Sequence, residues 1–154
     1  MLIFTKHLDV RDYDARHLEL VLDHEQRRRM RSRVTASDGT TVGLALPHGT
    51  VLQDGNQLAT EQGHRAIIRA ASEHVCAVVA EGHFKLAKIA YHLGNRHTSV
   101  QFDSGCLYFL HNSVLARLCE TLGGLVTEQW RSFDPEALAS SAHHHTNENE
   151  QACR

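Results

Sequence analysis

The spacing of apolar and polar residues changes near residue 72, which predicts two domains in this chain of 154 residues. Before that point, short runs of alternating or β-branched residues are separated by turn sequences, as is typical of small β domains. Residues 1–72 are therefore expected to form an all-β domain, a small sandwich or an open barrel. The expected strands include 33–35, 41–46, 50–52 and 66–69, and the expected turns are Ser37-Asp38-Gly39, Pro47-His48-Gly49 and Asp54-Gly55-Asn56.

Residues 73–138 contain two segments of helical period among further strands. The continuous apolar run at 75–80 predicts a buried strand. Within 84–93, apolar residues recur every three or four positions, which predicts a helix. Gly94 and Asn95 are expected to end this helix, because both residues tolerate the left-handed conformation of a helix C-terminus.

The remaining elements of this domain complete a known order. Two short strands, 99–102 and 106–110, are expected on either side of the turn Asp103-Ser104-Gly105. A second helix from about residue 114, capped by Asn112 or Ser113 and stopped by Gly123-Gly124, precedes a last strand at 125–130. The order is βαββαβ, that of the ferredoxin-like split unit, and the expected fold class is α+β.

Histidine is the unusual feature of the composition, with thirteen copies in the chain. Residues 139–154 form a polar tail that we expect to be disordered without metal, and this tail contains His143, His144 and His145. A segment with nothing to bury cannot use these side chains for packing. Imidazole is a usual ligand of nickel, copper and zinc, so the tail histidines are candidate metal ligands.

Charge and motifs exclude several classes of function. A formal net charge of −2 argues against a nucleic-acid or membrane binder. Lys6 and His7 interrupt the N-terminal apolar residues too early for a signal peptide, and no apolar run is long enough to span a bilayer, so we expect a cytoplasmic protein. Zinc-protease, serine-hydrolase and phosphate-loop motifs are missing, which argues against an enzyme. Three cysteines lie in apolar stretches and are expected to be buried: Cys76, Cys106 and Cys119.

His97 is the first candidate ligand outside the tail. It follows the predicted end of the helix by a few residues, on an exposed connection into a strand. Asn95 and Arg96 flank it and could orient its ring. One exposed histidine cannot form a metal site alone, but a two-fold axis beside this loop would bring two copies together. His111, between a strand and a helix, is either a secondary ligand or an ordinary loop residue.

Arginines are concentrated between Arg27 and Arg33. In an extended segment, Arg27, Arg29, Arg31 and Arg33 would project from one face. Such a face either protects the edge of a sheet with charge or binds an acidic protein partner.

The run Ala90-Tyr91-His92-Leu93-Gly94-Asn95-Arg96-His97 closely resembles the signature of the UreE family of urease accessory proteins, which are nickel metallochaperones. Two further stretches resemble the same family: the glycine-rich segment 38–55, and Phe133-Asp134-Pro135-Glu136 followed by a histidine-bearing tail. The resemblance covers roughly residues 18–136 and the tail.

This resemblance implies an N-terminal domain for protein interaction and a C-terminal domain that dimerises. His97 matches the family histidine that binds nickel at the dimer interface, and the tail histidines match a region that supplies further ligands. His111 matches the first of two histidines that form a peripheral site in some members, whereas Ser113 occupies the second position. The implied partners are the urease-maturation GTPase and the apo-urease complex with its other accessory proteins.

The sequence therefore predicts a cytoplasmic, homodimeric chaperone that delivers Ni²⁺ for assembly of the urease active site. His97 of both subunits and the tail histidines would hold the ion, and Cu²⁺ or Zn²⁺ could take its place. Two alternatives stay open. A zinc-dependent hydrolase would need three fixed ligands and a general base, and a plain protein-interaction adaptor would carry its histidines incidentally.

Overall fold

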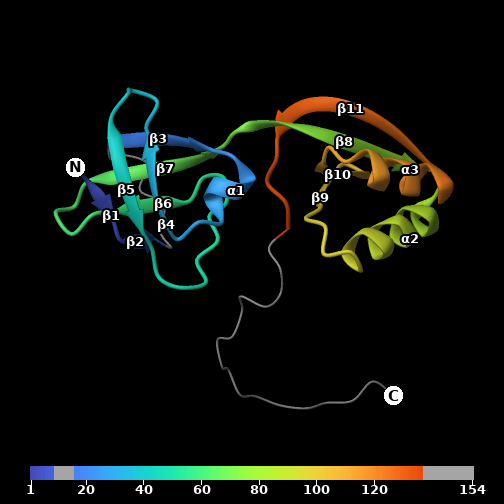
Figure 1. Cartoon of the computed structure of the whole chain (residues 1–154), viewed down its shortest axis with the longest axis horizontal. Helices are drawn as coiled ribbons and strands as arrows, with labels where there is room; N and C mark the ends of the chain where they lie inside the picture. The colour runs from blue at the N-terminus through green and yellow to red at the C-terminus, as the bar shows by residue number, and fades with distance from the viewer. Residues whose placement is uncertain (9–15, 137–154) are drawn as a thin grey trace, which may run out of the picture.

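The N-terminal part of the computed structural model is built from short strands and one helical turn (Figure 1). The structure describes residues 1–8 and 16–136. The N-terminal elements are β1 (Ile3–Phe4), β2 (Lys6–Leu8), β3 (His17–Leu22), α1 (His24–Arg27), β4 (Arg31–Thr35), β5 (Thr41–Ala45), β6 (Gln57–Ala59) and β7 (Arg65–Ala70).

These strands form two sheets that share one core. One sheet has the order β1-β5-β4, and the other has the order β2-β6-β7-β3. The chain passes from the first sheet to the second at Thr5, between β1 and β2. Buried side chains from both sheets, such as Phe4, Val42, Leu20 and Ile68, belong to a single apolar cluster. The expected β domain is confirmed, with α1 as its helical addition.

One expected strand of this domain is wrong. Residues 50–52 have no strand geometry, and Thr50 instead closes a turn by donating its N–H to the Pro47 carbonyl at 3.2 Å. The Leu52 side chain is fully buried and its N–H donates to the Arg27 carbonyl at 3.2 Å. The apolar residues of this segment are therefore those of a buried loop. In so short a run, the spacing of apolar residues does not distinguish a buried loop from a strand.

The C-terminal unit has the expected ferredoxin-like order. Its sheet runs β11-β8-β10-β9, and every neighbouring pair is antiparallel. Both helices contribute to one core with this sheet, through residues such as Ile89, Leu93 and Cys119. The elements are β8 (Ser72–Ala80), α2 (His83–Gly94), β9 (Gln101–Asp103), β10 (Cys106–Leu110), α3 (Ser113–Thr121) and β11 (Gly124–Ser132).

Local chemistry explains where these elements end. Asn112 caps α3, because its side-chain oxygen accepts the N–H groups of Val114 and Leu115 at 3.0 Å each. The β9–β10 hairpin turns through Ser104 and Gly105, both with positive φ, as a two-residue hairpin of this hand requires. The Asn112 cap and the hairpin turn were both expected from the sequence.

Residues Phe133 and Asp134, just after β11, join the two units through α1. Arg27, the last residue of α1, is only 2% exposed. Its guanidinium donates to the Asp134 carboxylate and to the Phe133 carbonyl. The other Asp134 carboxylate oxygen accepts the N–H of Asp54 at 3.1 Å. A buried arginine thus links the N-terminal unit to the chain that leaves the C-terminal sheet.

The extended arginine face expected at 27–33 is wrong. Asp23 caps α1 in a reciprocal capping box with Gln26, so this stretch begins as a helical turn and only Arg31–Thr35 is a strand. Arg27 is buried while Arg31 and Arg33 are exposed. The strand that carries the last two is indeed the edge of its sheet.

His24 also lies at this junction. Its ring Nε2 is 3.1 Å from the Ser99 hydroxyl, and the edge of the ring meets Phe133 with 5.5 Å between centroids. Burial lowers the pKa of His24 below its ordinary value, and the positive charges of Arg27 and Arg28 lower it further. The neutral imidazole is therefore the form that fits this junction.

Candidate functional site

His97 occupies the position that ends helix α2. The Thr98 N–H donates to the Leu93 carbonyl at 3.1 Å, and the His97 N–H donates to the Gly94 carbonyl at 2.9 Å. These two bonds define a Schellman motif at the end of the helix. In this motif the first residue beyond the helix C-cap adopts a left-handed conformation and is usually glycine. Here that residue is His97, with φ of +56°.

The expectation that Gly94 and Asn95 would supply the left-handed residue is wrong. Gly94 is still helical and Asn95 has ordinary right-handed helical angles. A non-glycine residue in the left-handed region costs about 1–2 kcal/mol. The fold keeps an imidazole at a position where glycine would be easier, which points to a use for the side chain.

The His97 side chain is exposed and free to accept a ligand. Among the described residues, none forms a hydrogen bond with its ring. The flanking arginine does not orient it, because the Arg96 guanidinium donates to the His92 carbonyl at 3.0 Å. Arg96 therefore stabilises the last turn of α2, and the expected positioning of the ring by its neighbours is not observed.

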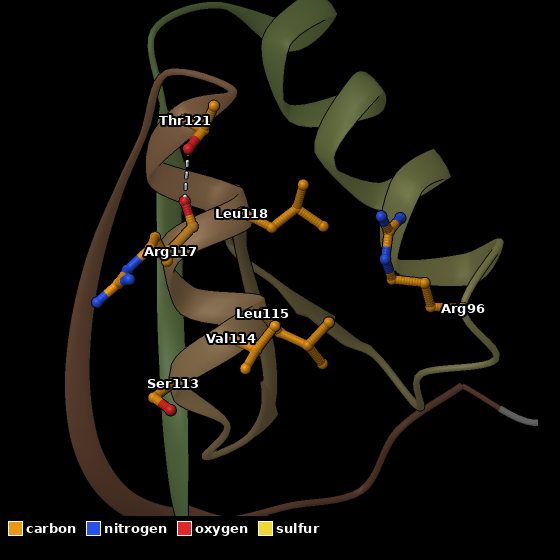
Figure 2. Close-up of a pocket in the computed structure, with 7 residues that line it drawn as sticks. All are labelled: Arg96, Ser113, Val114, Leu115, Arg117, Leu118 and Thr121. Atoms are coloured by element: carbon orange, nitrogen blue, oxygen red, sulfur yellow. Dashed lines mark hydrogen bonds between the residues drawn. The ribbon is translucent and has the colours of Figure 1, made fainter.

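A groove lies beside this loop, between Arg96 and helix α3 (Figure 2). Its volume is about 410 Å³. Figure 2 shows Leu115 and Leu118 directed from α3 toward the side on which Arg96 lies. The lining residues are Arg96, Ser113, Val114, Leu115, Arg117, Leu118 and Thr121.

Large apolar side chains are exposed on both helices of this face. Val114 on α3 is 75% exposed, and Phe84 and Tyr91 on α2 are 84% and 69% exposed. Val114 lines the groove, whereas Phe84 and Tyr91 are exposed elsewhere on α2. Isolated exposed apolar residues are ordinary, but several on the two helices that cover one sheet are typical of a protein-binding surface.

His111 lies in a second group of side chains. Its Nε2 is 3.2 Å from a carboxylate oxygen of Glu128, and its ring stacks on His74 with 4.4 Å between centroids. No sequence motif connects His74 and Glu128 with His111, and neither residue was predicted as a ligand. The predicted tail ligands His143, His144 and His145 lie outside the described residues.

Two of the cysteines are poorly suited to bind metal. Cys76 and Cys119 are fully buried, as expected. Burial raises the pKa of the Cys119 thiol to about 11, so it stays protonated at neutral pH and offers no thiolate. Cys106 is half-buried, which is less than expected.

A β sandwich followed by a ferredoxin-like domain, with an exposed imidazole beside an apolar groove, defines a two-domain binding protein. No helix within residues 1–8 and 16–136 is long and apolar enough to cross a membrane.

The family model described as the UreE urease accessory protein C-terminal domain matches residues 73–153, and the corresponding N-terminal model matches residues 4–71. The chain therefore belongs to the UreE family of urease accessory proteins.

Individual relatives agree with this assignment. The chain is 37% identical over 145 residues to the urease accessory protein UreE of Acinetobacter baylyi, covering 94% of this chain and 91% of that protein. It is 37% identical over 131 residues to the UreE of Proteus mirabilis, covering 85% and 81%. It is 38% identical over 140 residues to the UreE of Aliivibrio fischeri, covering 86% of each.

Proposed function

We propose that this chain is a metallochaperone for urease, which binds Ni²⁺ as a homodimer and delivers it to the maturing enzyme. The observation that carries the proposal is the His97 imidazole, exposed, without a hydrogen-bond partner among the described residues, and held at a strained helix end. The relatives of this chain are urease accessory proteins, and a metal ligand of this kind would serve the assembly of the urease metal centre.

The chemistry of a single ligand supports the proposed homodimer. One imidazole binds a divalent ion weakly, whereas a two-fold axis presents two equivalent imidazoles to the same ion. The groove lined by Val114 and Leu118 lies beside the His97 loop, and its exposed apolar surface would be covered in such a dimer. Covering this surface would also fix the separation of the two rings.

Delivery requires a site that is open and incomplete. Two imidazoles leave several coordination positions for water or for the tail residues His143, His144 and His145. A ligand from a partner protein can then enter before a chaperone ligand leaves. For nitrogen ligands Cu²⁺ binds more tightly than Ni²⁺, so metal choice must depend on availability and on the docking partner. The urease-maturation GTPase and apo-urease with its other accessory proteins are the proposed partners, in the cytoplasm.

Equilibrium dialysis against nickel tests this function. Wild-type protein is expected to bind nickel, and His97→Ala is expected to lose the tightest site. His83→Ala, which removes an exposed histidine from the start of the same helix, is the matched control and should bind like wild type. Truncation after Ser140 should lower the number of ions bound while the tightest site remains.

If His97→Ala binds the first equivalent of nickel as tightly as wild type, His97 is not the ligand. If neither protein retains nickel, the chain is an adaptor whose histidines are incidental.

A further inference from the structure

Three strands of the C-terminal sheet bring polar side chains together at one end of the sheet. Cys76, Phe109 and Val126 contact the core beneath α2 and α3. His74 lies two residues before Cys76 on β8, and Glu128 lies two residues after Val126 on β11. His111 lies two residues after Phe109, on the direct extension of β10. Since side chains alternate across a sheet, all three face the helix-covered side, just beyond the apolar core.

The strand register brings them into contact. Glu128 lies opposite Cys76, Trp130 lies opposite His74, and the His111 N–H donates to the His74 carbonyl at 3.0 Å. The Nε2 atoms of His74 and His111 are 3.1 Å and 3.2 Å from the two different carboxylate oxygens of Glu128. One carboxylate therefore bridges two imidazoles that come from different strands.

Aromatic stacking orients both rings. The His74 and His111 rings are stacked at an interplanar angle of 8°. Trp130 stacks on the other face of this pair through His74, with 5.2 Å between centroids and an angle of 11°. Stacking restricts the rotation of both rings, which lowers the entropic cost of binding. Because the nitrogen lone pairs lie in the ring planes, the two rings would have to tilt toward each other to share one ion.

We propose that His74, His111 and Glu128 form a binding site for one divalent transition-metal ion of borderline softness, such as Zn²⁺, Ni²⁺ or Cu²⁺. Two imidazoles and one carboxylate are a common ligand set for such ions. The donor atoms lie within 4.8 Å of one another. Metal bonds of about 2.0–2.2 Å place tetrahedral ligands about 3.4 Å apart, so each side chain needs to move by less than about 1 Å.

This ligand set does not need a second histidine at residue 113, which is serine in this chain. The His111 ligand is completed by His74 and Glu128, from other strands, and not by a histidine close to it in sequence. Three protein ligands leave at least one open position for water or for an incoming group. Because each chain carries its own complete set, this site does not depend on the dimer or on His97.

The single tryptophan of the chain makes the proposal measurable. Trp130 is stacked on His74, so an open-shell ion bound there should quench its fluorescence, whereas Zn²⁺, with a filled d shell, should quench little. Titration of the full chain with Cu²⁺ or Ni²⁺ should give saturable quenching, and added Zn²⁺ should reverse it by competition.

Substitutions separate this site from the proposed nickel site. Glu128→Gln and His111→Ala should each weaken the quenching constant at least about tenfold. Exposed His48, in a turn of the N-terminal domain, provides the control His48→Ala, which should titrate like wild type. His97→Ala should keep the quenching in full, even though it is expected to lose the tightest nickel site. Failure of the His97 proposal and failure of this one are therefore distinguishable.

Two results would overturn the proposal. One is an unchanged quenching constant in both Glu128→Gln and His111→Ala, which would assign the ion to another place in the chain. The other is the absence of saturable quenching by wild-type protein. Far-ultraviolet circular dichroism of each variant checks that it is folded, and the near-isosteric Glu128→Gln tests the site even if His111→Ala does not fold.

Discussion

Replacing His97 by glycine should stabilise the metal-free protein while removing its proposed nickel ligand. In its present conformation, with φ of +56°, a residue with a Cβ is strained by about 1–2 kcal/mol. Glycine relieves this strain but gains more freedom in the unfolded chain, which offsets about 0.4–1 kcal/mol. The His97 ring forms no hydrogen bond with the described residues, so its loss has little other effect on folding.

From the middle of these two ranges, the net gain expected for His97→Gly is about 0.8 kcal/mol, which for a chain of this size raises the Tm by about 2–3 °C. His97→Ala is the matched variant, because it also removes the imidazole but keeps a Cβ. Its stability should stay close to that of wild type. Both variants should lose the tightest nickel site to the same extent.

Thermal or urea unfolding of the three proteins, in the presence of a chelator and at equal concentration, measures the difference. A His97→Gly protein that is no more stable than His97→Ala would refute the strain argument. If the two variants differed in nickel binding, the role assigned to the imidazole would be in doubt, because both lack it.

Three further predictions concern the domain junction and the dimer. Asp134→Ala should lower the free energy of unfolding in urea by about 3 kcal/mol, because it leaves the buried Arg27 guanidinium without its anion. The control is Glu25→Ala, which removes the carboxylate of the exposed ion pair with Arg29 and should change the free energy of unfolding little. His24 has a lowered pKa in the folded protein, so its contribution to stability is present above its ordinary value of 6.5 and is lost as the pH falls below it. His24→Asn should therefore show a weaker loss of unfolding free energy than wild type between about pH 7 and pH 5, and a difference that is constant with pH would contradict this. Val114→Asp places a charge on the exposed apolar surface of α3 and should shift the protein from dimer to monomer in light scattering; a dimer of unchanged affinity would place the interface elsewhere.

The C-terminal domain could be predicted from the sequence because its signals are local. The apolar stripe of α2, the Asn112 cap and the turn at Ser104 each depend on residues within one turn of each other. The end of α2 near Gly94 was also predicted, whereas the residue with the left-handed conformation was not. The hydrogen bonds put the left-handed position at His97. Glycine and asparagine are the usual residues there, so the preceding Gly94 and Asn95 were the expected choice, although histidine is also more frequent in this conformation than most other residues.

In the N-terminal domain the first three strands, the helix α1 and β6 were missed. β1 and β2 have only two and three residues, too few to show a period. A local signal for α1 does exist, since Asp23 and Gln26 have the spacing of a capping box, but the arginine-rich stretch that follows is equally compatible with an extended segment. The burial of Arg27 depends on Asp134, more than a hundred residues away, and this contact has no local signature.

The cluster of His74, His111 and Glu128 shows the same limit. The three ligands come from β8, β11 and the residue after β10, so sequence spacing carries no metal motif. The expected βαββαβ order does carry a usable signal. With the β11-β8-β10 arrangement known, side-chain alternation places these residues on one face. The sequence neighbours of each histidine alone do not indicate the group.

Native mass spectrometry at limiting nickel tests most directly whether two His97 side chains share one ion. The first nickel is expected on a species of two chains, and His97→Ala should not form this species at the same concentration. Nickel that first appears on single chains, or a two-chain species that binds it equally well without His97, would contradict the proposed site.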